Sequence, residues 1–350
     1  MHKELVKRFK CPACNADASR LEVTTFREQG DVVLDGVLIC PACKGWYPIE
    51  DALLELVVPD LLDKEGLAGF FHAYEAKLIA AGCRLPDMAK IAAGHEAQIE
   101  QRKHFDWYAD NEQQDYNAYQ NTPFWRAADT IAFSRWKTMV RKDAWILDVG
   151  SADGRSSFQW TDLVDHVVGF DISKKMIRKA ILRARKAGLE QRTSFFVGDA
   201  DRIPVRDAAF EYACTYGVLH HVPKPDATYR EIIRLIKPDG IFFASENNKS
   251  AFRAVFDWLM RISPLWTELA GEEPLISLAM VNDWAKGQPV RVSTRTAVFL
   301  PPHVFNIVGN SVAKPLMRLT DCLNQGLPWF RHQGGLIVFE SQKTTGASAS

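Results

Sequence analysis

Four cysteines stand in two identical Cys-Pro-Ala-Cys turns, at Cys11–Cys14 and Cys40–Cys43, with 25 residues between the turns. Two thiolates of one such turn can face a single ion, and two turns complete a tetrahedral shell around Zn²⁺. The intervening segment alternates apolar and polar residues, as strands joined by glycine turns do. Cys11, Cys14, Cys40 and Cys43 are therefore predicted to bind a structural zinc ion, because four protein ligands leave no coordination position for catalysis.

A second group of residues has the types and spacing to bind a small molecule. Residues 144–149 form an apolar run with one acid, Asp148, and lead into a loop that contains Gly150 and Gly154. A parallel strand followed by a glycine turn brings backbone N–H groups to a ligand at the carboxyl edge of a sheet. From this loop alone the ligand could be a dinucleotide, a phosphate or an adenosyl compound.

Two further acids follow the next strand-like segments. Asp171 lies near the end of the segment 166–173, and Asp199 near the end of 193–200. A carboxylate about 20 residues after a glycine loop is placed to accept both hydroxyls of a ribose. Asp171 stands 21 positions after Gly150. The loop and the acids together predict a nucleoside-binding site at one edge of a parallel sheet.

Alternating strand and helix patterns must position these residues. The predicted fold class is α/β, a Rossmann-like sheet with helices on both faces, preceded by a small zinc-ribbon domain and a helical linker. The expected units are the ribbon at 1–60, a helical linker and pocket cap at 61–140, a catalytic domain at 141–340 with a substrate-side insertion at about 247–300, and a disordered tail at 341–350.

The composition limits the function classes. Among 350 residues, 43 basic and 43 acidic side chains give no net attraction to nucleic acid or to an anionic membrane, although a local basic patch is compatible with this balance. No apolar run is long enough to predict a transmembrane segment. The N-terminus, MHKELVKRFK, lacks the apolar core of a secretory signal. We therefore expect a cytoplasmic protein, where paired cysteines more often bind metal than form disulfides.

With these motifs in this order, residues 144–246 resemble the class I S-adenosylmethionine-dependent methyltransferases. The branch they resemble most is that of the quinone-biosynthesis enzymes, methyltransferase type 11. The family's acid-x-Gly-x-Gly-x-Gly motif stands here as Asp148, Gly150, Ala152 and Gly154, with alanine in place of the middle glycine. The stretch RLIKPDGIFFASE matches the family before and along its fifth strand.

The resemblance implies S-adenosylmethionine as the methyl donor. Asp171 matches the family's ribose-binding acid, and Asp199 matches its adenine-contacting acid. Asp153 would repel a pyrophosphate at this loop, whereas the donor carries a cationic sulfonium and no phosphate, so a dinucleotide is disfavoured. The predicted donor site consists of Asp148, Gly150, Ser151, Ala152, Gly154, Asp171, Ile172, Asp199, Ala200 and Tyr216.

The cysteine-rich region carries a second resemblance. The segment ICPACKGWYPIEDALLELVVPDLL resembles small zinc-ribbon proteins that activate methyltransferases. Ala52 stands where that family usually has glycine, so its binding properties are not carried over. The ribbon is expected to dock on a partner protein or on the catalytic domain of its own chain.

Two histidines are candidates for proton transfer. His220 and His221 follow the fourth predicted strand, in GVLHHVPKP. Histidine titrates near neutral pH, which suits a base that removes a proton from a hydroxyl or amine acceptor. The alternative is that these histidines only order the loop and the donor pocket.

The predicted function is methyl transfer in a biosynthetic step to a small, partly apolar acceptor, such as a secondary metabolite, a quinone-like compound or a lipid- or sugar-linked molecule. After the fifth strand, residues 251–262 and 272–287 are predicted to form amphipathic helices, and their apolar residues suit either such an acceptor or a second core. Trp258 and Trp284 are expected to affect acceptor affinity. An RNA base methyltransferase with an RNA-docking ribbon is one alternative, disfavoured by the balanced charge. A non-catalytic binding module is another, disfavoured by the intact acids.

Overall fold

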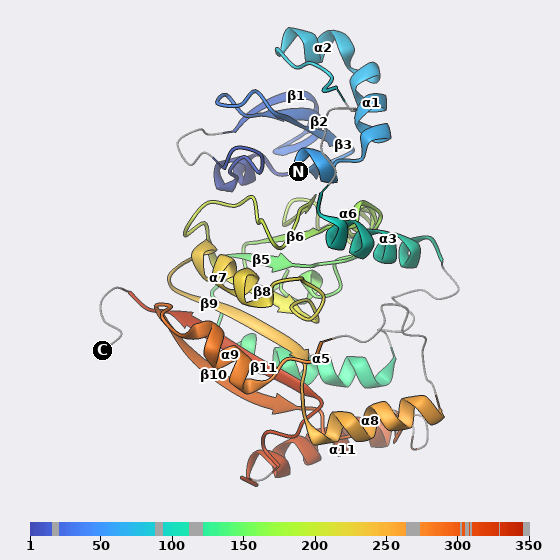
Figure 1. Cartoon of the computed structure of the whole chain (residues 1–350), viewed down its shortest axis with the longest axis vertical. Coiled ribbons are helices and arrows are strands. Elements are labelled where there is room, and N and C mark those ends of the chain that lie inside the picture. Colours follow the sequence, from blue (N-terminus) through green and yellow to red (C-terminus); the bar gives the residue numbers. More distant parts are fainter. Residues whose placement is uncertain are drawn as a thin grey trace.

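In the described part of the chain, eleven strands form one continuous sheet, in the order β1-β2-β3-β4-β7-β6-β5-β8-β9-β11-β10 (Figure 1). The structure is a computed structural model that describes the chain except for residues 16–20, 88–93, 112–121, 264–273, 302, 305–307, 309, 329 and 346–350. The strands are β1 (Glu22–Gln29), β2 (Val32–Ile39), β3 (Trp46–Glu50), β4 (Leu53–Glu55), β5 (Trp145–Val149), β6 (His166–Asp171), β7 (Thr193–Val197), β8 (Phe210–Tyr216), β9 (Ile236–Asn247), β10 (Val290–Ala297) and β11 (Leu336–Lys343).

The central strands β7, β6, β5, β8 and β9 are parallel, and β11 lies antiparallel between β9 and β10. The chain moves to one side of the sheet from β5 to β7 and to the other side from β8 to β9. The strand order therefore reverses between β5 and β8, and open α/β sheets bind ligands at the carboxyl ends of the strands at such a reversal. This topology confirms the predicted fold class.

Helices cover both faces of this central sheet (Figure 1). The helices are α1 (Lys64–Ala73), α2 (Glu75–Ala80), α3 (Glu96–Asp110), α5 (Pro123–Trp136), α6 (Lys174–Lys186), α7 (Pro225–Leu235), α8 (Ala251–Ile262), α9 (Leu278–Ala285) and α11 (Asn310–Gln325), with short 3-10 helices η1 (Lys3–Arg8), η2 (Pro59–Leu61) and η5 (Ser157–Gln159). Side chains of α7, α9 and η1 share a core with one face, and those of α5, α6 and α11 pack on the other. Strands buried on both sides read as apolar runs, as β6 and β7 do.

Local signals explain where two of these helices begin and end. The Ser173 hydroxyl caps α6 by accepting a hydrogen bond from the Met176 N–H at 3.1 Å. The sequence predicts that α7 continues to the Pro-Asp-Gly stretch, but α7 ends at Leu235 and β9 begins at the next residue. Pro238 explains this earlier end, because proline disfavours a helical conformation for the residue before it.

The ribbon continues the sheet of the α/β domain. Strand β4 pairs in parallel with β7, through Leu54 beside Phe196 and Glu55 beside Val197. The rings of Phe9 and Phe196 lie 5.0 Å apart in a core that both parts share. The ribbon is thus docked within its own chain, on the β7 edge of the sheet. Loss of the ribbon is therefore expected to expose that edge, and the two parts are expected to unfold together.

The segment after β9 contains both expected and unexpected elements. α8 spans the residues predicted as a helix, but β10 is a strand of the sheet within the range expected to form the insertion. Trp284 lies in the core with its ring 6.0 Å from that of Tyr229, so Trp284→Ala is expected to lower stability and not to report on acceptor affinity. Trp258 is instead 58% exposed.

The end of the chain is more ordered than the sequence predicts. β11 continues to Lys343, three residues into the segment expected to be a disordered tail, and it pairs there with β10. Residues 346–350 of that segment lie outside the described residues. No helix in the described part of the chain is both long and apolar enough to cross a membrane.

Candidate functional site

The glycine loop after β5 has a backbone that side chains would disturb. Gly150 and Gly154 have φ angles of +70° and +87°, and a Cβ atom on Gly150 would lie 2.6 Å from a Val218 methyl group. Ala152, in place of the family's middle glycine, also has a positive φ of 44°. Its N–H donates to Asp171 Oδ2 at 3.0 Å. The small alanine side chain therefore allows the loop to close, at the cost of a left-handed conformation that L-residues disfavour.

Asp148, at the end of β5, holds the glycine loop in place. Its side chain is fully buried and accepts hydrogen bonds from the hydroxyls of Ser156 at 2.7 Å and Ser157 at 2.5 Å, and from the Cys214 thiol at 3.2 Å. Burial raises the pKa of Asp148, and these hydrogen bonds oppose that shift. The carboxylate therefore links β5 to the loop residues and to β8. Asp148 was predicted as part of the donor site, and the contacts it makes are those of a residue that holds the loop in place.

Asp171 is the last residue of β6, and Asp199 lies two residues after the end of β7. Asp171 accepts hydrogen bonds from the N–H groups of Ala152 and Ser173, and burial raises its pKa to about 6. Asp199 Oδ1 accepts from the Asp201 N–H at 3.0 Å, and burial raises the pKa of Asp199 to about 6 as well. Asp199 Oδ2 is buried without a hydrogen-bond partner in the described part of the structure. A buried acceptor without a donor is the expected state of a group that binds a polar ligand atom.

Helix α3 covers this edge of the sheet. Asp106 accepts a hydrogen bond from the Ser173 hydroxyl at 2.6 Å, and Phe105 and Ala109 pack against Ala152 and Met176. The sequence predicts a pocket cap in this region, but it did not identify Asp106. A single acid in a charged amphipathic helix carries no local signal of its partner.

The two candidate histidines follow β8 and differ in their contacts. His220 Nδ1 lies 2.8 Å from Glu246 Oε2, and Glu246 also accepts hydrogen bonds from the N–H groups of Val218 and Leu219. Because a carboxylate only accepts, Nδ1 carries the proton of a neutral His220, and Nε2 is the nitrogen that can take another. His221 instead packs its ring 5.5 Å from that of Phe105 in α3.

Glu246 is not among the site residues predicted from the sequence. The signal was present, because Glu246 stands near the end of the fifth predicted strand, in FFASE, at the same sheet edge as the loop after the fourth. Glu246 is buried, and its burial together with its hydrogen bonds indicates a role in holding the loop and orienting His220.

Tyr216 ends β8 next to a charged pair that the sequence did not reveal. The Arg155 guanidinium lies 5.4 Å from the centre of the Tyr216 ring, and Arg155 forms an ion pair with Asp129 of α5. Burial raises the pKa of Tyr216 and of Asp129. Nearby in the chain, the predicted Ser151 presents a buried hydroxyl without a hydrogen-bond partner in the described residues. Arg155 and Asp129 are half-buried side chains of opposite charge, a combination that can bind a zwitterionic group.

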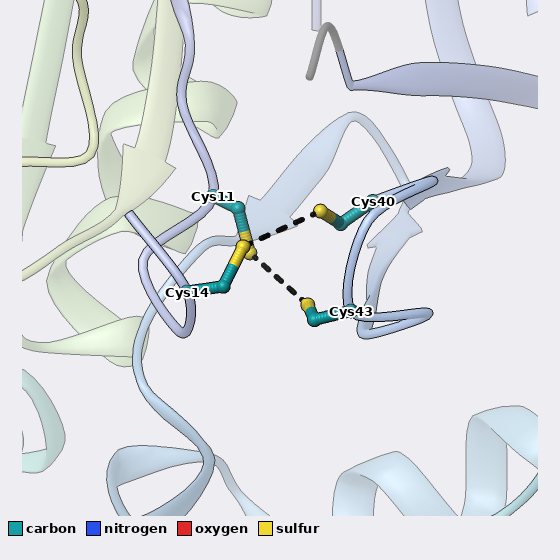
Figure 2. A group of neighbouring side chains, drawn as sticks. All are labelled: Cys11, Cys14, Cys40 and Cys43. Atoms are coloured by element: carbon teal, nitrogen blue, oxygen red, sulfur yellow. Dashed lines mark hydrogen bonds between the residues drawn. The ribbon is translucent and has the colours of Figure 1, made fainter. Parts of the chain in front are cut away.

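The four cysteines converge from the two predicted turns, as Figure 2 shows. All four sulfur atoms lie within 4.8 Å of one another, and the Cys11–Cys43 and Cys14–Cys40 pairs are each 3.7 Å apart. A tetrahedral zinc ion with Zn–S bonds of about 2.3 Å requires sulfur atoms separated by roughly 3.8 Å. The Tyr47 hydroxyl lies 3.1 Å from the Cys11 sulfur and can donate to it. The geometry fits a tetrahedral metal ion with four thiolate ligands.

Comparisons with known proteins agree with both parts of the chain. A family model described as a methyltransferase domain matches residues 141–285, and one described as Trm112p-like protein matches residues 9–51. A sterol 24-C-methyltransferase of Gibberella zeae is 31% identical over 118 residues, which cover 33% of this chain and 28% of the relative. A ubiquinone/menaquinone biosynthesis C-methyltransferase of Bartonella tribocorum is 29% identical over 140 residues, covering 39% and 49%.

The chain thus spans less than half the length of these relatives. Among solved structures, a complex of the Haloferax volcanii Trm112 methyltransferase activator with a methyltransferase is similar to 69% of this chain and 98% of its own, with 18% identity and a TM-score of 0.49. The strand order, the two family matches and the cysteine cluster lead to one assignment: this chain carries a class I S-adenosylmethionine-dependent methyltransferase domain, preceded by a Trm112-like region with a four-cysteine cluster.

Proposed function

We propose that the protein transfers a methyl group from S-adenosylmethionine to a small, partly apolar acceptor. The observation that carries this proposal is the pair of buried acids, Asp171 and Asp199, beside the glycine loop at the point where the strand order reverses. Buried carboxylates are unfavourable unless they are paired or hydrogen-bonded, and the hydroxyls and amino group of an adenosine supply donors for them.

The residues of the predicted donor site have distinct roles in this proposal. Asp171 would accept the ribose hydroxyls, Asp199 with the neighbouring Ile172 and Ala200 would border the adenine, and the loop from Gly150 to Gly154 would face the amino-acid end. Arg155 and Asp129 are suited to bind the carboxylate and the ammonium group of that end. The bound donor supplies an electrophilic methyl group on a sulfonium.

His220 is the proposed proton acceptor when the nucleophile is a hydroxyl or an amine. Glu246 holds Nδ1–H and so leaves Nε2 as the basic nitrogen, which is the tautomer that a general base requires. The carboxylate also stabilises the imidazolium that forms when the proton is taken. His221 is the alternative base, but its ring packs edge-on against that of Phe105 in α3.

The acceptor class rests on charge and on the kinds of molecule that the relatives use. The relatives are named as a sterol 24-C-methyltransferase and as a C-methyltransferase of ubiquinone and menaquinone biosynthesis, and sterols and quinones are largely apolar molecules. The balanced charge of 43 basic and 43 acidic residues offers no general attraction to RNA.

The test of the acceptor class is to incubate the protein with methyl-labelled donor and, separately, a metabolite extract or total RNA. Label is expected in the metabolite fraction, with little dependence on salt. Label in RNA, with activity that falls steeply as salt increases, would support the RNA alternative instead.

We further propose that the four cysteines bind one structural zinc ion per chain. Removing it by chelation, or replacing Cys40 with serine, is expected to lower the unfolding temperature of the whole protein by on the order of ten degrees, because a structural zinc site contributes several kcal/mol of folding free energy. The unfolding should remain a single transition, since the ribbon shares a sheet and a core with the α/β domain.

Elemental analysis and thermal unfolding followed by circular dichroism test this prediction. Cys322→Ser is the matched control, because Cys322 is exposed and lies outside the cluster, and it should leave both measurements unchanged. A protein purified without metal and insensitive to chelators would contradict the assignment, and so would a disulfide between these cysteines.

The raised pKa values of Asp171 and Asp199 predict how donor binding depends on pH. The pKa values of Asp171 and Asp199 are both about 6, so each carboxyl takes up a proton as the pH falls through that value. A protonated carboxyl is a poorer acceptor, and the proton therefore competes with the donor. Donor affinity measured by calorimetry should decrease as the pH falls through about 6. The same measurement on Asp199→Asn should show a shallower decrease, because one of the two titrating groups is gone. An affinity independent of pH across this range would argue against both acids as ligands.

A further inference from the structure

Helix α3 is fixed across the carboxyl edge of the sheet by contacts at both of its ends. Near its start, the Gln98 amide donates a hydrogen bond to Asp201 Oδ2 at 2.8 Å, in the loop after β7. Near its end, Asp106 accepts from the Ser173 hydroxyl at the beginning of α6. α3 accordingly lies beside α6 (Figure 1). Side chains between these two contacts are therefore held in position over the proposed donor site.

Gln101 is one of the side chains between these contacts. Residues 98, 101 and 105 are spaced by three and four positions, so they lie on one side of the helix. Gln98 and Phe105 define what that side meets, because Gln98 reaches the loop after β7 and Phe105 packs on the ring of His221, after β8. At a rise of about 1.5 Å per residue, the backbone of Gln101 lies roughly 4.5 Å along the axis from that of Gln98. Gln101 therefore faces the same sheet edge as its two neighbours.

The amide oxygen of Gln101 is a buried acceptor without a donor. Gln101 is a half-buried residue, but its Oε1 atom is buried and has no hydrogen-bond partner among the described residues. Asp199 Oδ2 is in the same state. The two groups are connected through few residues, because Asp199 Oδ1 accepts from the Asp201 N–H and Asp201 accepts from Gln98, one helical turn before Gln101.

Two buried acceptors in one region are unfavourable until a ligand supplies donors for them. An amino group on a planar ring carries two N–H bonds and can donate one to each acceptor, whereas a hydroxyl donates one and a carbonyl donates none. We propose that Gln101 Oε1 accepts one hydrogen bond from the exocyclic amino group of the adenine, while Asp199 Oδ2 accepts the other. Gln101 then selects adenine over a purine with an oxo group at that position. This inference rests on the proposed place of the adenine beside Asp199.

Titration calorimetry with two ligands tests this selectivity. S-adenosylhomocysteine carries the amino group, and S-inosylhomocysteine carries a carbonyl oxygen in its place. The wild-type chain is expected to prefer the adenosyl compound by on the order of a hundredfold or more, because the carbonyl would face two acceptors. Gln101→Met keeps the length of the side chain and removes its acceptor. It should weaken binding of the adenosyl compound on the order of tenfold and leave the inosyl compound unweakened, so the preference shrinks.

Gln98→Met is the matched control on the same helix. Its amide anchors α3 to Asp201, so the loss of this contact should weaken both ligands by a similar factor and leave the preference in place. Thermal unfolding of both variants reports that they remain folded.

Each alternative gives a different result. Equal losses for the two ligands in Gln101→Met, or no loss at all, would overturn the role of Gln101 while wild-type binding of S-adenosylhomocysteine still supports the donor site. An unchanged preference with a raised KM for the methyl acceptor would place Gln101 at the acceptor and would also overturn it. A wild-type chain that binds neither ligand would contradict the donor site itself.

Discussion

Asp171→Ala is expected to reduce the affinity for S-adenosylmethionine by on the order of a hundredfold or more, because hydrogen bonds to a charged group each contribute about 1.5–3 kcal/mol. The proposed partners are two ribose hydroxyls in a buried place, which would lose their acceptor with no water to replace it. Titration calorimetry with the donor, or with its demethylated product, measures this loss directly. The effect should appear for both ligands, because the ribose is common to them.

The control must separate ligand contacts from loop structure, since Asp171 also accepts hydrogen bonds from Ala152 and Ser173. Asp162→Ala removes an exposed acid of the same domain and should leave affinity unchanged. Thermal unfolding of Asp171→Ala reports how far the loop itself is destabilised. Undiminished donor affinity in a folded Asp171→Ala protein would remove the main support for the proposed donor site.

His220→Ala is expected to slow turnover by about 10²–10⁴-fold, the usual contribution of a positioned general base, while donor affinity stays close to that of the wild type. This prediction applies to a hydroxyl or amine acceptor, once label transfer has identified one. Glu246→Gln should have a smaller effect on rate, because the amide oxygen can still accept from Nδ1–H. It should also move the acid limb of the pH–rate profile to lower pH, since a neutral amide no longer stabilises the imidazolium.

His221→Ala distinguishes the two neighbouring histidines. The base proposed here is the histidine held by the buried carboxylate, so His221→Ala should retain most of the turnover and leave the pH–rate profile in place. A large loss for His221→Ala with little change for His220→Ala would exchange the roles. Equal, modest losses with an unmoved pH profile in every variant would mean that both histidines only order the loop.

Local patterns in the sequence determined a large part of this description. The repeated Cys-Pro-Ala-Cys turns place two ligands each by short-range geometry, so the four-cysteine cluster could be predicted without the fold. The glycine loop and the acids Asp171 and Asp199 follow apolar strand patterns, and parallel strands bring their ends to one edge whatever the details of packing. α8 was predicted at its observed bounds, because its apolar spacing and its N-terminal cap at Ser250 are both local.

The tertiary structure alone decided which distant groups meet. Glu246 reaches His220 across 26 residues, and Arg155 of the loop pairs with Asp129 of α5, because neighbouring strands and a covering helix bring these segments together. The periodicity of a sequence does not indicate which distant residues become partners. In the same way, Trp284 lies in the core while Trp258 faces solvent, although both stand in amphipathic helices with similar patterns.

The pairing of the ribbon with the methyltransferase sheet is the largest feature that only the tertiary structure reveals. Either part alone could be recognised from its motifs, but the parallel pairing of β4 with β7 depends on an unpaired strand edge that exists only after the central sheet has formed. Local sequence determines which strands and turns form. Long-range pairing and burial determine which strand edges pair, which charged groups meet and which apolar faces are covered. These contacts depend on the free energy of the whole folded chain.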